Sequence, residues 1–136
     1  TLSERASDAE AELLAEKENK ADLIAGIDLS NEAPEVANIL IDLAQRETMN
    51  LSASFAARTV NELGQQVKLL SNTHRFAGFA VLKAPDVPSV LLELGYLSNP
   101  REEQLLKTEA YRAKLSQAVL KALDVYFDQL RKAGPQ

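Results

Sequence analysis

The sequence predicts an α/β fold, a mixed β-sheet with helices packed around it. The segment from Val90 to Leu92 is apolar throughout and follows Pro88, and a short apolar run bounded by turn residues is typical of a strand buried on both faces. A helix start follows at Asn99 and Pro100, and amphipathic helical patterns cover much of the remaining chain. A strand, a loop and a helix in this order are typical of the α/β class.

The composition is that of one packed domain, and it excludes several classes of protein. With 136 residues, 46% of them hydrophobic, the chain is long enough for one core and too short for two ordinary domains. The formal net charge of −5 argues against a nucleic-acid-binding protein. No apolar run approaches the roughly 20 residues that span a bilayer, and the absence of cysteine excludes disulfides and thiolate metal sites. The chain starts at Thr1 rather than Met, and we expect its natural N-terminus to be missing.

The N-terminal part predicts the end of a strand and then a helix. Residues 1–3 are interpreted as the tail of a strand. Ser7 with Glu10 three residues later matches a capping box, and the segment after it is rich in Ala, Leu, Glu and Lys. This pattern predicts a helix over residues 8–24 that ends near Gly26.

One acidic residue interrupts the apolar face of this helix. The face is formed at helical spacing by Ala11, Leu14, Glu18 and Ala21. The simpler interpretation of Glu18 is an acid at the edge of the stripe whose carboxylate reaches water. A functional role is the alternative.

Two further helices are predicted in the middle of the chain. Pro34 fits the first turn of a helix whose apolar stripe is Val36, Ile39, Leu40 and Leu43. We expect a break at residues 47–50 and then a third helix over residues 51–71. Its buried side is expected to consist of Leu51, Phe55, Val60, Leu63, Val67 and Leu70.

The only histidine, His74, lies in a polar loop before the next predicted strand. It is either a zinc ligand or general acid, or a plain surface residue. The strand expected at residues 79–83 is joined to the next one by residues 83–88. Because a parallel crossover needs a dozen or more residues, this short connection favours a tight turn and a mixed sheet.

The apolar segment described first ends in a carboxylate, Glu93. Such a group costs desolvation free energy unless it is paired, bound to a metal or used in proton transfer. Glu93 is therefore either a structural residue held by backbone N–H groups or an Arg, or a functional one at the sheet edge where ligands gather. Gly95 permits an unusual backbone geometry beside it. Asn99, Pro100 and Glu102 then fit the N-cap, first residue and capping-box partner of a helix.

A final helix is predicted over residues 108–131. One side is lined by Tyr111, Leu115, Val119, Ala122, Tyr126 and Leu130, and Leu123 and Phe127 broaden it. Basic residues lie towards its C-terminal half, where they suit the helix dipole.

The stretch over residues 79–99 resembles the C-terminal signature of the zinc-dependent N-acetylmuramoyl-L-alanine amidases, the amidase-3 type of peptidoglycan hydrolase. The resemblance implies that Glu93, in the element Glu93-Leu94-Gly95-Tyr96, is catalytic. It also implies a Zn²⁺ ion bound by two His and one Glu, which we expect on segments upstream of Thr1. On this view residues 1–136 form the C-terminal portion of a single amidase domain and are inactive alone.

Residues 18–24 resemble the cell-division subgroup of these amidases, some of which hold themselves inactive through a glutamate that occupies the zinc. The resemblance carries that inhibitory role onto Glu18, with Glu32, Glu35 and Asp42 as the next candidates. It further implies a regulatory helical insertion near residues 28–48, a LytM-type activator protein as partner and a periplasmic location in a bacterium.

The expected function is hydrolysis of the amide between N-acetylmuramic acid and L-alanine in peptidoglycan, for cell-wall remodelling and daughter-cell separation. An alternative from another class is a non-enzymatic α/β interaction module that binds a protein partner, with Glu93 merely structural.

Overall fold

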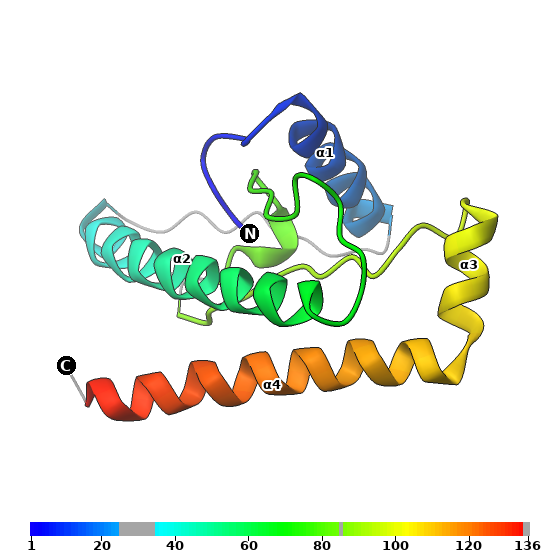
Figure 1. The fold of residues 1–136 in the computed structure, drawn as a ribbon. Helices are drawn as coiled ribbons and strands as arrows, with labels where there is room; N and C mark the ends of the chain where they lie inside the picture. The colour runs from blue at the N-terminus through cyan, green and yellow to red at the C-terminus, as the bar shows by residue number, and fades with distance from the viewer. Residues whose placement is uncertain (25–34, 85, 135–136) are drawn as a thin grey trace. The chain divides into compact units, whose positions relative to one another are not determined.

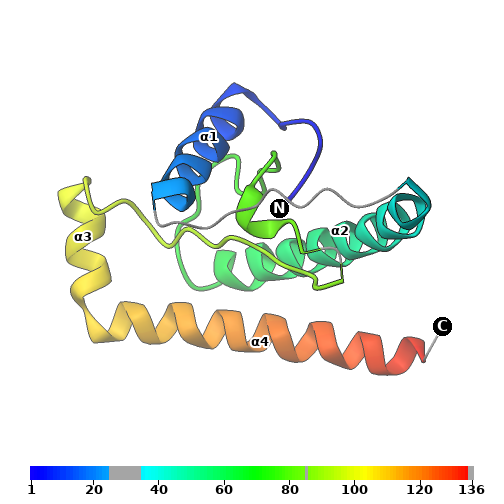
Figure 2. The same cartoon turned by 180° about the vertical axis from the view of Figure 1, so that it is seen from behind.

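The computed structural model describes residues 1–24, 35–84 and 86–134, and the side chains of these residues except 21–24, 35–42 and 133. In chain order the elements are α1 (Ala9–Ile24), α2 (Glu35–Gly64), a 3₁₀ turn η1 (Ala80–Leu82), α3 (Pro100–Lys107) and α4 (Glu109–Ala133) (Figure 1). Figure 2 shows the same elements from behind. Among these described residues, no helix is long and apolar enough to cross a membrane.

The predicted α/β class is wrong, because the described ranges contain helices and no β-strand. The only β-type pairing in them is one isolated parallel bridge, between Leu2 and Ala77. The segment expected as a strand at residues 79–83 forms η1 instead, and residues 88–94 lie outside any helix or strand. A strand is stabilised by a neighbour that pairs with its N–H and C=O groups, and the described residues supply no such neighbour to 88–94. An apolar run alone therefore does not make a strand here.

The chain divides into two compact units, and unit 1 comprises residues 1–54 and 74–91. Its core lies where α1 packs against η1 and the segment before it. The buried residues are Ala11, Ala15, Ala77, Phe79 and Leu82. Alanines on the buried face of α1 let its backbone come close to the neighbouring segment, and Leu2, Ala6 and Leu14 pack around this contact.

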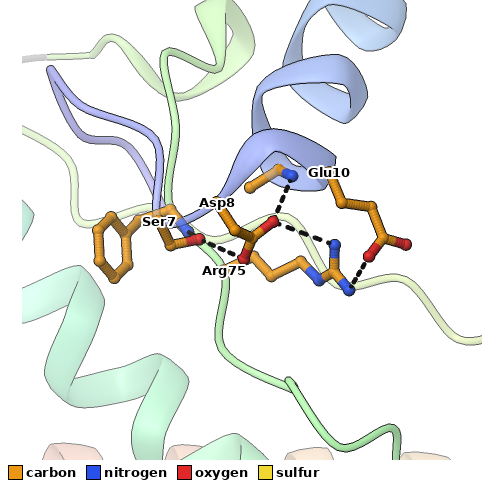
Figure 3. A network of polar contacts seen from close by, with 6 residues as sticks. Ser7, Asp8, Glu10 and Arg75 are labelled. Carbon is orange, nitrogen blue, oxygen red and sulfur yellow. Dashed lines mark hydrogen bonds and ion pairs between the residues drawn. The ribbon is translucent and has the colours of Figure 1, made fainter.

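Helix α1 is described from Ala9 to Ile24, within the predicted range, but its N-cap is Asp8 and not Ser7. The Oδ1 atom of Asp8 accepts a hydrogen bond from the Ala11 backbone N–H at 2.8 Å, and the Ser7 hydroxyl donates to Oδ2 at 3.1 Å. Glu10, the expected capping-box partner, instead pairs with Arg75 at 2.7 Å, and Arg75 also lies 3.6 Å from Asp8 (Figure 3). The cap therefore ties the start of α1 to the loop that carries Arg75. The predicted end near Gly26 lies outside the described residues.

Helix α2 is one continuous helix of 30 residues where two helices were predicted. The expected break at residues 47–50 is wrong, because the polar residues there include neither Gly nor Pro and the helix runs through them. The helix ends at Gly64, well before the predicted residue 71. The side chains of Val36, Ile39 and Leu40 lie outside those described; Leu43, expected to be buried, is 61% exposed.

Unit 2 comprises residues 55–73 and the described residues from 92 onwards. Its core consists of Leu63, Leu115 and Ala118, with Val67, Leu69, Leu106 and Tyr111 packed around them. The rings of Phe55 and Tyr126 lie 5.3 Å apart between centroids, and Lys121 pairs with Glu62 at 2.7 Å.

Helix α4 confirms the predicted final helix to within two residues at either end. Leu115, Ala122 and Tyr126 of its predicted apolar side are buried, whereas Phe127 and Leu130 are 52% and 39% exposed. Arg131 and Lys132 lie in the last turn, as predicted from the helix dipole. Thr108 separates α4 from the shorter α3, and the chain turns sharply there (Figures 1 and 2).

Candidate active-site segment

Glu93 lies in the extended segment between η1 and α3, and it is exposed. Its apolar neighbours Leu91, Leu92 and Leu94 are 38%, 39% and 45% exposed, so the buried strand expected here does not form. Within the described part of the chain, the Glu93 carboxylate forms no hydrogen bond or ion pair. The structural alternative, a buried Glu held by N–H groups or an Arg, is therefore not what these residues form.

The turn after Glu93 depends on Gly95, which has a φ of 152°. L-residues with a side chain rarely adopt this backbone conformation. A Cβ atom at this position would lie 3.2 Å from the Glu102 Oε2 atom and 3.3 Å from Leu106 Cδ1. The structure thus confirms that the unusual geometry beside Glu93 requires glycine.

The carboxylate of Glu102 holds this turn in place. Its Oε2 atom accepts a hydrogen bond from the Tyr96 backbone N–H at 2.8 Å, and its Oε1 atom accepts one from the Asn99 side-chain amide at 2.9 Å. Asn99 caps α3 as predicted, because its Oδ1 atom accepts from the N–H groups of Arg101 and Glu102 at 3.1 and 3.4 Å. The capping box differs from the standard one, since Glu102 bonds to Tyr96 rather than to the Asn99 backbone.

A second contact, which the sequence did not reveal, holds the segment before Glu93. The Ser52 hydroxyl on α2 accepts a hydrogen bond from the Ser89 backbone N–H at 2.9 Å and donates one to the Thr48 carbonyl at 2.7 Å. Ser52 is only 3% exposed. Because the contact joins residues 37 positions apart, no local pattern predicts it.

Glu18 is half-buried on α1, and its carboxylate forms no hydrogen bond or ion pair with the residues that the structure describes. The next residue, Asn19, makes the firm contact that sequence reasoning missed. Its Oδ1 atom accepts from the Ala80 N–H at 2.7 Å, and its Nδ2 atom donates to the Gly78 carbonyl at 2.9 Å. The side chain thus pairs with the backbone as a neighbouring strand would, and it fixes α1 beside Glu18. Of the other candidate acids, Glu32 and the side chains of Glu35 and Asp42 lie outside the described residues.

His74 is half-buried rather than a plain surface residue. Its Nε2 atom lies 3.0 Å from the Thr1 hydroxyl, and its ring meets Phe76 edge-on at 6.2 Å between centroids. Burial lowers the pKa of His74 below its ordinary value, and the positive charge of the Thr1 amino group lowers it further.

The described residues do not fit a zinc ion. Catalytic zinc needs three protein ligands, commonly His, Asp or Glu, around one point. No group of three or more such side chains comes together anywhere in the ranges described. The donors of this part of the chain therefore do not form a metal site by themselves.

Comparison with known proteins identifies the family. The family model described as N-acetylmuramoyl-L-alanine amidase (Amidase_3) matches residues 17–125. The chain is 39% identical over 122 residues to N-acetylmuramoyl-L-alanine amidase AmiA of Salmonella typhimurium, covering 90% of this chain and 42% of that protein. It is 38% identical to AmiC of Escherichia coli, covering 90% of this chain and 29% of that protein. A probable cell wall amidase of Staphylococcus aureus, LytH, is 43% identical over 72 residues, which are 52% of this chain and 25% of LytH.

The chain thus spans less than half the length of these relatives. The matched region nevertheless includes Glu18, the whole of the segment around Glu93 and most of α4. Because the family model covers most of its 136 residues, the chain belongs to the N-acetylmuramoyl-L-alanine amidase family of the Amidase_3 type.

Proposed function

We propose that this chain is part of a peptidoglycan amidase and supplies its general base, Glu93. The substrate is the amide between the lactyl group of N-acetylmuramic acid and L-alanine. The observation that carries the proposal is an exposed carboxylate, without a partner among the described residues, beside a glycine-dependent turn in an element with the family's Glu-x-Gly-aromatic pattern.

Amide hydrolysis requires a group that moves protons in both directions. The carboxylate of Glu93 takes a proton from the attacking water while the oxygen of that water bonds to the carbonyl carbon. The same carboxyl group then gives the proton to the leaving nitrogen as the C–N bond breaks. An exposed carboxylate that pairs with none of the described cationic side chains suits this role, because its oxygen atoms are accessible to water and substrate.

The family is zinc-dependent, and the described residues do not form a zinc site. We infer that the metal ligands come from residues outside the described ones, and we assign none of the steps above to the metal. The proposed role of Glu93 is that of a base and not of a ligand.

The test is the substitution Glu93→Gln in the intact protein, which keeps the shape of the side chain and removes the base. We expect hydrolysis of purified peptidoglycan to fall about 10²- to 10⁴-fold, with zinc content unchanged. Glu109→Gln, at an exposed position in the first turn of α4, serves as the control. Loss of zinc together with activity would make Glu93 a metal ligand, and unchanged activity would show that Glu93 is not the base. An intact unsubstituted protein that hydrolyses no peptidoglycan would favour the non-enzymatic interaction module.

The regulation that we propose is inhibition by Glu18. The resemblance to the cell-division subgroup supports it, as does a half-buried carboxylate without a partner among the described residues. In the resting enzyme Glu18 would serve as a ligand of the metal and so block the active site. A LytM-type activator in the periplasm then acts on the insertion near residues 28–48 and favours the open state, which requires that it bind this state more tightly.

Glu18→Ala in the intact protein is expected to raise basal hydrolysis and to lower the additional effect of the activator. Glu16→Ala, an exposed neighbour on α1, is the control. If basal hydrolysis stays unchanged while the fold and zinc content are intact, Glu18 is an ordinary glutamate of a helix face. The inhibitory role would then pass to Glu32, Glu35 or Asp42.

A further inference from the structure

We propose that Ser52 and Glu102 are positioning residues that hold the two ends of the segment carrying Glu93. Ser52 binds the backbone N–H of Ser89, four residues before Glu93, and Glu102 binds that of Tyr96, three residues after it. This inference rests on the proposed role of Glu93 as the general base. Neither side chain is assigned a contact with substrate, so each acts through the backbone.

The Ser52 hydroxyl both donates and accepts a hydrogen bond, and this defines its orientation. Its hydrogen points to the Thr48 carbonyl in the preceding turn of α2, at 2.7 Å. This leaves the oxygen lone pairs to receive the Ser89 N–H, at 2.9 Å. Ser52 is 3% exposed, so water does not readily replace this acceptor if the hydroxyl is removed. Ser89 is thereby attached to a helix rather than to a flexible loop.

Both oxygens of the Glu102 carboxylate also accept hydrogen bonds. Oε2 accepts from the Tyr96 N–H at 2.8 Å, and Oε1 accepts from the Asn99 side-chain amide at 2.9 Å. The Asn99 Oδ1 atom is at the same time occupied as the N-cap of α3. Glu102 therefore cannot turn away from Tyr96 without losing its bond to the cap, and the turn at Gly95 is fixed relative to α3.

Between these two anchors, residues 90–95 have no strand partner among the described residues, and all but Val90 are exposed. An extended segment without a ladder of hydrogen bonds depends on its ends for its position. A general base must be placed accurately, since a misplacement of about 1 Å can cost about 100-fold in rate. Each anchor fixes the backbone within four residues of Glu93, Ser52 at Ser89 in unit 1 and Glu102 at Tyr96 in unit 2.

The structure offers a matched control for each anchor. Thr59 on α2 is also 3% exposed, and its hydroxyl donates to the Phe55 carbonyl at 2.9 Å, four residues back as in Ser52. Unlike Ser52, Thr59 forms no hydrogen bond with the segment around Glu93 among the described residues. Glu103 lies beside Glu102 in the first turn of α3, and it pairs with Lys107 at 2.6 Å.

The test compares Ser52→Ala and Glu102→Gln with Thr59→Ala and Glu103→Gln in the intact protein. Glutamine at 102 is similar in shape to glutamate, but its NH₂ group faces either Tyr96 N–H or the Asn99 amide, so one of the two bonds is lost. We measure kcat and KM on peptidoglycan fragments, zinc content, and hydrogen exchange at the Ser89 and Tyr96 amides. Exchange reports directly on each anchor and does not depend on activity.

We expect kcat to fall about 10- to 100-fold in Ser52→Ala and Glu102→Gln, with KM and zinc content unchanged. The Ser89 amide exchanges faster in the first variant and the Tyr96 amide in the second. Both controls keep kcat, even if Thr59→Ala unfolds at a lower temperature. If Ser52→Ala does not fold, the Glu102→Gln arm and its control decide the question.

The inference is overturned if the anchor variants keep the kcat of their controls although the two amides exchange faster, while Glu93→Gln is inactive. In that case Glu93 is the base and the anchors serve stability alone. If Glu93→Gln itself keeps its activity, the proposed function fails and this inference falls with it. The two failures are therefore distinguishable.

Discussion

The side chain of Asn19 offers the sharpest test of whether α1 must move during activation. Asn19→Ala removes two hydrogen bonds, one from the Ala80 N–H at 2.7 Å and one to the Gly78 carbonyl at 2.9 Å. Both join α1 to the segment around η1, so the substitution weakens the attachment of α1 beside Glu18. It leaves the Glu18 carboxylate unchanged.

The size of the effect follows from the two bonds. A hydrogen bond of this kind contributes about 0.5–1.5 kcal/mol net, and one of the two is exposed while the other is partly buried. We therefore expect a loss of about 1–2 kcal/mol, which corresponds to about a 5- to 30-fold change in the equilibrium between attached and detached α1. If detachment of α1 is what frees the active site, basal activity rises by up to the same factor.

The assay is release of soluble fragments from dye-labelled peptidoglycan by the intact protein without activator, together with urea unfolding. Lys17→Ala, at an exposed position two residues earlier on α1, is the control. A variant that loses stability as expected but keeps wild-type basal hydrolysis would refute the reasoning. Release of α1 would then not limit activity.

Three further predictions concern the chain as a whole, the turn after Glu93 and the histidine. Residues 1–136 alone, with added zinc, should release no stem peptides from peptidoglycan, because their described side chains form no metal site; detectable release would show that the metal ligands are present after all. Gly95→Ala should destabilise the fold by about 1–3 kcal/mol in urea unfolding, because its φ of 152° strains any side chain. Gly78→Ala, where a Cβ meets nothing within 4 Å, should change stability much less, and equal effects at the two glycines would contradict this reading. Because burial lowers the pKa of His74, the folded state favours neutral imidazole, so stability is present above the ordinary pKa of 6.5 and is lost as the pH falls below it. Urea midpoints at about pH 7.5 and 5.5 should therefore differ less in His74→Gln than in the parent protein, and an equal difference would rule out His74 as the source.

The parts of the fold that the sequence predicted correctly are those governed by local signals. The cap of α3 follows from Asn99 and Pro100, which act within one turn, and the φ of Gly95 follows from glycine itself. The extent of α4 follows from helical periodicity. Each of these predictions needed only residues within a few positions of one another.

The errors have non-local causes. Whether residues 88–94 form a strand depends on a pairing partner, and apolar composition does not report one. The contacts of Asn19 with Ala80 and of Ser52 with Ser89 join residues 61 and 37 positions apart, so no local sequence pattern predicts either hydrogen bond. The false break in α2 has a different origin, since residues 47–50 include neither Gly nor Pro and their helix propensity is adequate.

The continuity of α2 limits how the region expected to be regulatory is able to move. The described helix extends from Glu35, inside that region, to Gly64 with no Gly or Pro between them, a length of about 45 Å at 1.5 Å per residue. Residues 35–48 are therefore one end of a stiff rod, and Ser52 lies on the same rod one turn beyond Thr48. A flap hinged at residues 47–50 would have to break the backbone hydrogen bonds of a helical turn. A partner that binds residues 35–48 therefore has two possible effects. It tilts α2 as a whole and displaces the Ser52 hydroxyl that binds Ser89, or it unfolds this part of the helix.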